Sequence, residues 1–386
     1  MAVAVVNSKG VRRVRAGHPW VYKSDVVSCD STTAGAVTVL DERRKLLGTA
    51  LLSPNSTILL RLVSRVDVSL NREFWLARVH GAYMRRLRYC GDRDAYRVVH
   101  GEADLLPGVF VDRYADALVL QTTCGGADAF ESTLVSVLQE VVQPKILVVR
   151  NDVSARRKEA LNQESRIAVG GPGTLVTYHE GHIALTIDLL ADQKTGAFLD
   201  QSTNHVRAGE LAHGRALDCF TYHGGFALQL ASRAEHVMAV DQSKLALSRG
   251  QENARSAGLT NLEWLAADVL ELLPRLVAQN ERFDTVVLDP PAFASTAKTL
   301  DAALAAYQQV NARALKLLHP NGLFITCSCS GRITAAMFEE MLGAAAADAR
   351  RSVQILERRG ASLDHPVLTD VPETEYLKCL ICAVSE

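Results

Sequence analysis

Short apolar runs bounded by turn residues dominate the first part of the chain. They cover residues 36–40, 46–51 and 57–63, and a Ser-Pro-Asn-Ser stretch separates the last two. Runs of this length between turn signals are typical of small all-β modules. The pattern therefore predicts a small β-barrel over residues 1–70. Apolar positions at helical spacing then predict a helix over residues 72–89.

The next segment mixes the two periodicities. Strand-like runs lie at 96–99, 109–111, 118–122 and 146–149, with a helical segment near 127–142. Two further strands, 174–178 and 182–187, are separated by Glu180 and Gly181, a pair typical of a hairpin turn. We expect residues 71–187 to form an α+β domain.

From about residue 188, strand-like and helical segments alternate regularly. The strand-like runs lie at 215–219, 236–240, 262–266, 283–288 and 322–327. This alternation is the signature of an α/β fold with a doubly wound, mostly parallel sheet. The sequence thus predicts three domains, 1–70, 71–187 and 188–386.

Composition narrows the class of protein. The 386 residues are 48% hydrophobic and 22% charged, which suits folded domains and argues against disorder. No apolar run is long enough to span a membrane, and the first residues are too short for a signal peptide. Eight cysteines without such a signal predict reduced thiols in the cytoplasm.

Charge is unevenly distributed although the net charge is only −1. The first hundred residues contain 17 Lys and Arg against 8 Asp and Glu, whereas the remainder contains 25 against 35. An excess of positive charge in the first hundred residues, with an excess of negative charge in the remainder, suggests that the N-terminal part contacts phosphate. A solvated basic surface is the equally open alternative.

Acidic residues and glycines follow the ends of the predicted parallel strands, where open α/β sheets bind ligands. The chain departs from G-x-G-x-x-G and has no phosphate-binding lysine motif, so a nucleoside site is favoured over a nucleotide-phosphate site. An acid after the second strand is placed to accept hydrogen bonds from ribose hydroxyls, and one after the third to face an adenine amino group. For each acid the alternative is a helix cap. The candidates are Asp218, Phe220, Thr221, Gly224 and Gly225 after the first strand, then Asp241, Asp268 and Asp289 after the next three.

Two cysteines lie at the end of the fifth strand, at the rim that also holds Asp289-Pro290-Pro291. A thiol beside an acid suggests group transfer to a flat ring by nucleophilic catalysis. Two alternatives remain: buried free cysteines, or a zinc site formed by Cys327 and Cys329 with Cys379 and Cys382. The apolar, strand-like run around Cys379 argues against metal.

The stretch from Leu217 to Gly331 resembles class I S-adenosylmethionine-dependent methyltransferases. Nearly the whole chain resembles the bacterial 23S rRNA (cytosine-5)-methyltransferase I family. The residues that carry this resemblance are Lys9-Gly10, Gly17-His18-Pro19-Trp20-Val21-Tyr22, Gly101 to Gly108, Asp112-Arg113-Tyr114, Gln193-Lys194-Thr195-Gly196, Phe198-Leu199-Asp200-Gln201, Asp364-His365-Pro366 and Tyr376-Leu377-Lys378.

The resemblance implies an N-terminal PUA domain, a central α+β domain and a Rossmann-like methyltransferase domain. It implies S-adenosylmethionine as cofactor, with Lys194 among its ligands, 23S rRNA as partner, and a homodimer. The apolar, strand-like run around Cys379 leads us to expect no metal. The resemblance places the nucleophile on Cys329, which adds to C6 of a cytosine, and it places Asp289 to steady the pyrimidine edge or relay a proton. RNA-contact candidates on the first domain are Lys9, Arg12, Arg13, Arg15, His18 and Trp20.

One position departs from many RNA cytosine-5 methyltransferases. Ala292 stands where they carry a second cysteine, so another base must release the product. Cys327 stays the alternative nucleophile. Three other functions remain open: 5-methyluridine formation by the same thiol chemistry, methylation of a purine nitrogen, and non-catalytic RNA binding on the same fold.

Overall fold

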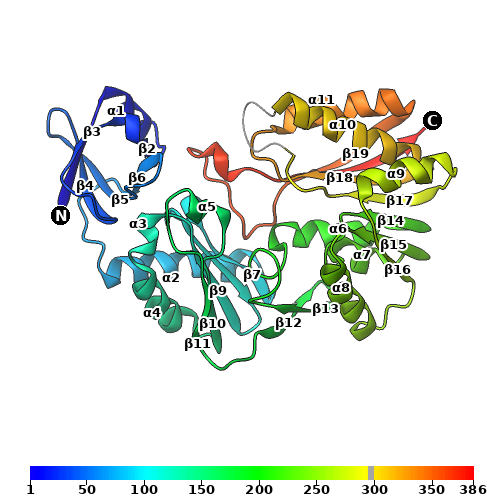
Figure 1. Ribbon diagram of the computed structural model, residues 1–386, viewed down its shortest axis with the longest axis horizontal. Coiled ribbons are helices and arrows are strands. Elements are labelled where there is room, and N and C mark those ends of the chain that lie inside the picture. The colour runs from blue at the N-terminus through cyan, green and yellow to red at the C-terminus, as the bar shows by residue number, and fades with distance from the viewer. Residues whose placement is uncertain (294–299) are drawn as a thin grey trace. The chain divides into compact units, whose positions relative to one another are not determined.

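The computed structural model of the chain describes residues 1–293 and 300–386 and divides into two compact units (Figure 1). The first unit contains Met1–Tyr178, Ile187–Ala197 and Leu363–Thr374, and the second contains His179–Thr186, Phe198–Ser362 and Glu375–Glu386. The predicted boundaries at residues 70 and 187 stay a prediction. None of the described helices is both long and apolar enough to cross a membrane.

The first sheet of the first unit has six strands in the order β2-β6-β5-β4-β1-β3. Their inward side chains, such as Val39 and Leu60, form a separate apolar core. The sequence analysis found β4, β5 and β6 but missed the elements before them. The strands are β1 (Ala2–Val6), β2 (Trp20–Tyr22), β3 (Val26–Cys29), β4 (Gly35–Asp41), β5 (Leu46–Leu52) and β6 (Ile58–Ser64).

Helix α1 (Ser8–Arg15) follows β1 because Asn7 caps it, accepting hydrogen bonds from the backbone N–H groups of Lys9 and Gly10. Val11 and Val14, three positions apart, face the core. Lys9, Arg12 and Arg15 are exposed and are also spaced by three. They therefore follow one outer side of the helix.

The second sheet of the first unit has five strands in the order β11-β10-β9-β8-β7. Two helices, α2 (Arg72–Tyr89) and α4 (Glu131–Val142), pack together and bury Trp75 and Leu134 in its core. The predicted α+β composition is thus confirmed, with β11 as the strand that was missed. The strands are β7 (Ala95–His100), β8 (Val109–Tyr114), β9 (Ala117–Thr122), β10 (Ile146–Arg150) and β11 (Ser165–Val169); the short helices are η2 (Gly101–Asp104), α3 (Gly125–Asp128) and α5 (Ser154–Arg157).

Buried ion pairs hold the far C-terminal part of the first unit, Leu363–Thr374, against α2 and β7. Arg86 pairs with Asp104 through both terminal amino groups at 2.6 Å and also donates to the backbone carbonyl of Asp364 at 2.9 Å, and Asp364 accepts from the backbone N–H of Arg97 at 2.7 Å. Arg93 also contacts Asp364, at 3.2 Å. The side chains of Arg86 and Arg93 are therefore held by carboxylates inside the first unit.

The hairpin of β12 (Leu175–Glu180) and β13 (Ile183–Asp188) follows, as expected from the Glu180-Gly181 pair. Gly181 adopts a positive φ of 59°, which glycine tolerates best.

The second unit is built on a seven-stranded sheet in the order β16-β15-β14-β17-β18-β20-β19. All neighbours are parallel except β20, which runs antiparallel to both β18 and β19. The strands are β14 (Arg215–Cys219), β15 (His236–Asp241), β16 (Leu262–Ala266), β17 (Phe283–Leu288), β18 (Leu318–Ser328), β19 (Ser352–Arg359) and β20 (Lys378–Ser385). The predicted doubly wound, mostly parallel sheet is confirmed; β19 and β20 extend it.

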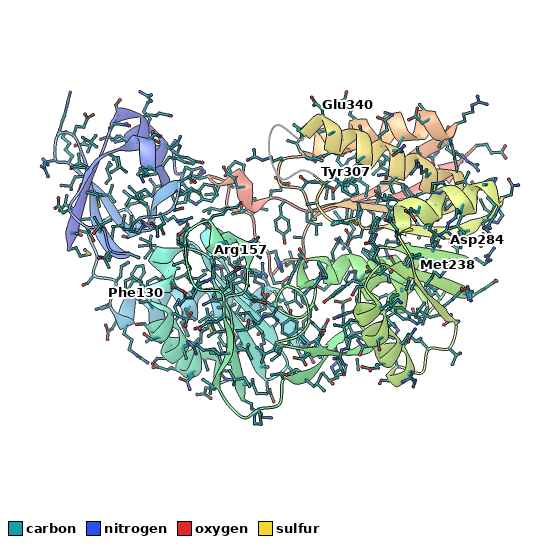
Figure 2. The ribbon with its side chains drawn as sticks, viewed as in Figure 1. Phe130, Arg157, Met238, Asp284, Tyr307 and Glu340 are labelled. Carbon is teal, nitrogen blue, oxygen red and sulfur yellow. The ribbon has the colours of Figure 1, made fainter. Side chains whose placement is uncertain are left out.

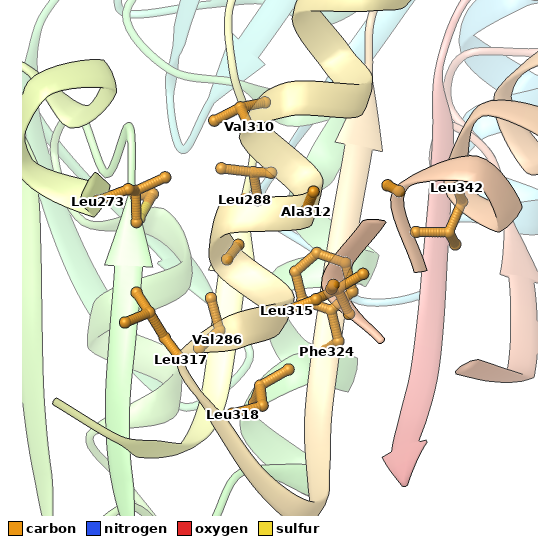
Figure 3. Close-up of a cluster of buried hydrophobic side chains, with 14 of the residues drawn as sticks. Leu273, Val286, Leu288, Val310, Ala312, Leu315, Leu317, Leu318, Phe324 and Leu342 are labelled. Carbon is orange, nitrogen blue, oxygen red and sulfur yellow. The ribbon is translucent and has the colours of Figure 1, made fainter. Parts of the chain in front are cut away.

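Helices cover both faces of this sheet (Figure 1). On one face, side chains of α9, α10 and α11 pack against strand residues such as Val286 and Phe324 (Figure 3). On the other, α6 and α7 bury alanines and Phe226 against Val237 and Ile325. The helices are α6 (Ser202–Leu211), α7 (Gly225–Leu230), α8 (Lys244–Ser256), α9 (Val269–Ala278), α10 (Leu300–Lys316) and α11 (Ala335–Ala349).

Candidate active site

The strand order reverses between β14 and β17, which are neighbours in the sheet although two strand–helix units separate them along the chain. Ligands of open α/β sheets bind outside the carboxyl ends of the strands at such a reversal. The backbone N–H of Asp289, just after β17, approaches the carbonyl of Cys219 at 3.4 Å. The two strand ends that carry predicted site residues therefore meet.

The chain turns sharply after β14. Phe220, Tyr222 and Gly224 all adopt positive φ, at 65°, 52° and 86°. A Cβ on Gly224 would lie 2.6 Å from the Trp264 ring, so the backbone passes that ring at a distance only glycine allows. At Gly225, where α7 begins, a Cβ would lie 2.5 Å from the His205 ring. The two predicted glycines thus shape a tight backbone turn at the strand end.

Asp218 is buried beneath this turn. Its Oδ2 accepts hydrogen bonds from the Thr221 hydroxyl at 2.5 Å and from the backbone N–H of Ala227 at 2.9 Å. Its Oδ1 is buried and has no hydrogen-bond partner among the described residues. Burial raises the pKa of Asp218 to about 7, although the hydrogen bond from Thr221 and the nearby His205 oppose the shift. A buried acceptor left open at the strand end fits a ligand that brings its own donor.

His205 and Glu180 form a buried pair beside Asp218 that the sequence analysis missed. The distance from His205 Nδ1 to Glu180 Oε1 is 2.7 Å. Burial lowers the pKa of His205, but the Glu180 carboxylate outweighs burial and the net shift is upward. Because the two residues come from β12 and α6, no local motif signals their pairing.

Asp241 lies where the sequence predicts an acid for the ribose. Its Oδ2 accepts from the backbone N–H of Tyr222 at 3.0 Å and its Oδ1 from that of Ser243 at 2.8 Å. Ser243 caps α8, as expected for its position. Each carboxylate oxygen has a second lone pair for a further donor, so the carboxylate is held in place and keeps acceptor capacity.

The remaining predicted cofactor residues differ in setting. Asp268 caps α9 by accepting from the backbone N–H of Leu270 at 2.8 Å, which is the alternative weighed for it. Asp289 accepts from Gln201 Nε2 at 3.0 Å. Lys194 belongs to the first unit, with a φ of 53°. The cofactor roles of all these residues stay predictions.

The two cysteines at the end of β18 differ in environment. Cys327 is fully buried opposite Cys379 on β20, and burial raises its pKa well above the ordinary thiol value. Cys329 directly follows the strand and is half-buried. A thiol nucleophile must be accessible and able to ionise. The structure therefore supplies the physical distinction between them that the sequence lacks.

Side chains of α10 and β20 surround this strand end. Tyr307 of α10, labelled in Figure 2, places its hydroxyl 3.1 Å from Ser328 Oγ, and its ring contacts that of Phe293. Lys378 at the start of β20 donates to the carbonyl oxygens of Ser330 at 2.6 Å and Tyr376 at 2.8 Å. Neither Tyr307 nor Lys378 was predicted as a site residue.

The zinc alternative is not supported by the positions of its cysteines. Cys379 packs with Cys327 against the α6 and α7 side of the sheet, whereas Cys382 packs on the side of α10 and α11. Residues three apart on a strand face opposite sides. Within residues 1–293 and 300–386, no group of three or more His, Cys, Asp or Glu is arranged to hold a metal.

The RNA-contact candidates of the first unit are partly engaged within the protein. Arg13 and Lys9 lie 2.6 Å and 3.7 Å from the buried Asp25, and Arg15 lies 3.6 Å from Asp41. Their environments therefore differ, and the most exposed cations are those on the outer side of α1. Two further candidates lie beside α1: Trp20 donates to Glu102 Oε1 at 2.9 Å, and His18 Nε2 lies 3.3 Å from Glu373 Oε2.

Comparison with known proteins now gives the family. A methyltransferase-domain model matches residues 211–360, and a PUA-like-domain model matches residues 4–65. A ribosomal RNA large subunit methyltransferase I from Tolumonas auensis is 36% identical over 375 residues, which cover 94% of each chain. This chain belongs to the ribosomal RNA large subunit methyltransferase I family. Membership and the methyltransferase domain confirm the predicted cofactor, S-adenosylmethionine.

Solved structures agree on the fold. A protein from Streptococcus mutans, proposed to be a SAM-dependent methyltransferase, superposes with a TM-score of 0.85 at 20% identity and covers 99% of this chain and 100% of its own. A proposed methyltransferase complexed with SAH gives the same TM-score, identity and coverage. The PUA-like and methyltransferase folds expected from the resemblance are thus confirmed.

The raised pKa of Asp218 predicts a pH-dependent stability. Its folded-state pKa of about 7 lies above the unfolded value of about 3.9, so the folded state keeps a proton that the unfolded state has lost. This stabilisation is complete below about pH 4 and is lost as the pH rises through 7. Asp218→Asn should flatten the fall in unfolding free energy across that window, by up to about 1.4 kcal/mol per pH unit, in urea denaturation. An unchanged slope would contradict the raised pKa.

Asp241 should contribute directly to cofactor affinity. On its predicted role, Asp241 accepts hydrogen bonds from two ribose hydroxyls, so Asp241→Ala should weaken binding of S-adenosylhomocysteine about 10²-fold in titration calorimetry. Glu340→Ala, an exposed acid on α11, is the control for loss of charge alone. Equal affinities for the two variants would exclude Asp241 from the site.

Proposed function

We propose that this chain transfers a methyl group from S-adenosylmethionine to C5 of a cytosine in 23S rRNA, through a covalent adduct of Cys329 with C6. The observation that carries the proposal is the half-buried thiol at the end of β18. Its support is the acid, Asp289, at the end of the neighbouring β17, on the same edge of the sheet. Membership of an rRNA methyltransferase family supplies the class of substrate.

Cytosine C5 is a weak nucleophile until C6 is attacked. In the proposed step the Cys329 thiolate forms an Sγ–C6 bond, and the electron pair displaced from the C5–C6 double bond makes C5 nucleophilic. S-adenosylmethionine, when bound, would supply an electrophilic sulfonium methyl, and C5 would bond to that methyl carbon as the carbon–sulfur bond breaks. A base then removes the C5 proton, the C5–C6 double bond re-forms, and the Sγ–C6 bond breaks to return the thiolate.

The residues that hold the cofactor in this proposal are those after β14 and β15. The turn at Gly224 lets the backbone approach it, and Asp241 accepts hydrogen bonds from its ribose. Asp218 offers the open Oδ1. Asp289, steadied by Gln201, lies beside the pyrimidine. Lys194, Phe220, Thr221, Gly225 and Asp268 complete the proposed set.

The thiol mechanism predicts a trapped complex. RNA containing 5-fluorocytidine at the target carries a C5 fluorine that a base cannot remove, so the Sγ–C6 bond should persist after methyl transfer. Wild type should yield an RNA adduct that survives denaturing electrophoresis, whereas Cys329→Ser should yield none and Cys327→Ser should retain it.

Each outcome separates the alternatives. Loss of the adduct in Cys327→Ser alone would identify Cys327, and not Cys329, as the nucleophile. Methyl transfer that survives in both variants would remove the thiol from the mechanism and favour methylation of a purine nitrogen. No transfer by wild type to any RNA, with intact cofactor binding, would favour the non-catalytic RNA-binding alternative.

We also propose that the outer side of α1, formed by Lys9, Arg12 and Arg15, contacts RNA phosphates, with Arg13, His18 and Trp20 beside it. No carboxylate pairs with Arg12 in the described part of the chain, so its charge is the most available of the set. Arg12→Ala should lower the slope of log affinity against log salt by about one, measured by filter binding to 23S rRNA. Arg12→Lys should keep the wild-type slope. Identical slopes in all three proteins would exclude α1 as a phosphate contact.

A homodimer in the cytoplasm is proposed from the family resemblance. At micromolar concentration, sedimentation velocity should give a species of about twice the chain mass of 41.9 kDa. A single monomeric boundary would contradict the dimer.

A further inference from the structure

A buried lysine lies directly across from the strand end that carries the thiol. Lys378 begins β20 and is the cross-strand partner of Ser328, the last residue of β18. Cys329 is the next residue along the chain. The antiparallel return of β20 therefore brings a cation beside the point where Cys329 leaves the sheet.

The surroundings of Lys378 are unusual for an ammonium group. The residue is only 7% exposed, and its two hydrogen bonds go to the carbonyl oxygens of Ser330 and Tyr376. In the described ranges of the chain no carboxylate forms an ion pair with it. Burying an ammonium without a carboxylate partner is costly. We therefore expect the Lys378 ammonium to have a negatively charged partner that forms when the site is active.

The charges around Lys378 identify that partner. Burial lowers the pKa of Lys378 to about 8, while Cys329 and then Glu375 act in the opposite direction. The interaction between Lys378 and Cys329 is mutual. A Cys329 thiolate favours the protonated form of Lys378, and protonated Lys378 favours the Cys329 thiolate. At neutral pH Lys378 is still largely protonated and able to exert this effect.

Among the described residues, two neighbouring ionisable groups, Tyr307 and Asp289, do not supply a positive charge at this strand end. The pKa of Tyr307 on α10 is raised by burial, so its hydroxyl is neutral near pH 7. Asp289, after β17, acts on Tyr307 and on Cys327 as a negative charge. A carboxylate near the site disfavours a second anion. A cation at the strand end favours the Cys329 thiolate against this effect.

We propose that Lys378 is the positioning residue that keeps Cys329 ionised, by placing its ammonium beside the thiolate while two carbonyl oxygens hold its side chain in place. For catalysis this inference rests on the proposed thiol mechanism. Ionisation of Cys329 is a property of the protein alone, however, and needs neither RNA nor cofactor to be measured.

The experiment follows alkylation of the intact protein by iodoacetamide across a range of pH, with mass spectrometry of the peptide that contains Cys329. In this reaction Sγ bonds to the reagent's methylene carbon as the carbon–iodine bond breaks, iodide leaves, and the thiol proton passes to the buffer. Cys29, the half-buried cysteine of the first unit, is an internal control in the same sample.

In wild type, Cys329 should titrate below the ordinary thiol pKa of about 8.5. Lys378→Gln removes the charge but keeps an N–H donor for the carbonyls, and should slow alkylation of Cys329 at pH 7 about tenfold or more. Lys378→Arg keeps the charge and should stay close to wild type. Alkylation of Cys29 should be the same in all three proteins.

Two results would overturn the proposal. The first is a wild-type Cys329 that titrates at or above the ordinary value, which requires no variant to fold. The second is a Lys378→Gln protein with unchanged Cys329 and Cys29 rates, which would leave Lys378 only as a cap for the two carbonyls. A shifted titration without a 5-fluorocytidine adduct would instead support Lys378 and contradict the proposed function.

Discussion

The reversal of strand order between β14 and β17 is the constraint on which the second unit depends. It places the turn at Gly224 and the acid Asp289 at adjoining strand ends, although about 65 residues separate them along the chain. The same edge continues to β18, so Cys329 lies one strand further along. A methyl donor and an acceptor ring held at this edge would each meet residues from different strands. Catalytic geometry therefore follows from strand order more than from any local motif.

Burial of charge is the second feature that shapes the site. Burial raises the pKa of Asp218 to about 7 because it disfavours the anion, whereas Glu180 outweighs burial at His205 and shifts its pKa upward. At the end of β18, Asp289 acts as a negative charge on Cys327, whereas Lys378 is a cation that interacts with Cys329. The protonation state of each ionisable group in the site therefore depends on one or two charged neighbours.

Much of this architecture was predictable from sequence, for a physical reason. Strands β14 and β17 and the second half of β18 are buried on both faces, so they read as largely apolar runs, and the acids at the strand ends mark the ligand edge. Strand β19 was missed because it alternates exposed and half-buried residues at the edge of the sheet. Helix α1 was missed because it contains glycine and four cations, with only Val11 and Val14 as its inward valines.

The long-range pairs were beyond local reasoning altogether. Glu180 with His205, Gln201 with Asp289, and Lys378 with the Ser330 carbonyl each join segments that meet only after folding. Nothing in their spacing distinguishes them from solvated residues. The distinction between Cys327 and Cys329 likewise needed burial, because both are cysteines of one short motif.

The central claim, methyl transfer to cytosine C5, has one direct measurement. Unmodified 23S rRNA is incubated with the intact protein and methyl-labelled S-adenosylmethionine, digested to nucleosides and analysed by mass spectrometry. The account predicts that the label appears in 5-methylcytidine with wild type and is absent with Cys329→Ser. Label in 5-methyluridine or in a methylated purine, or label in 5-methylcytidine that persists in Cys329→Ser, would contradict it.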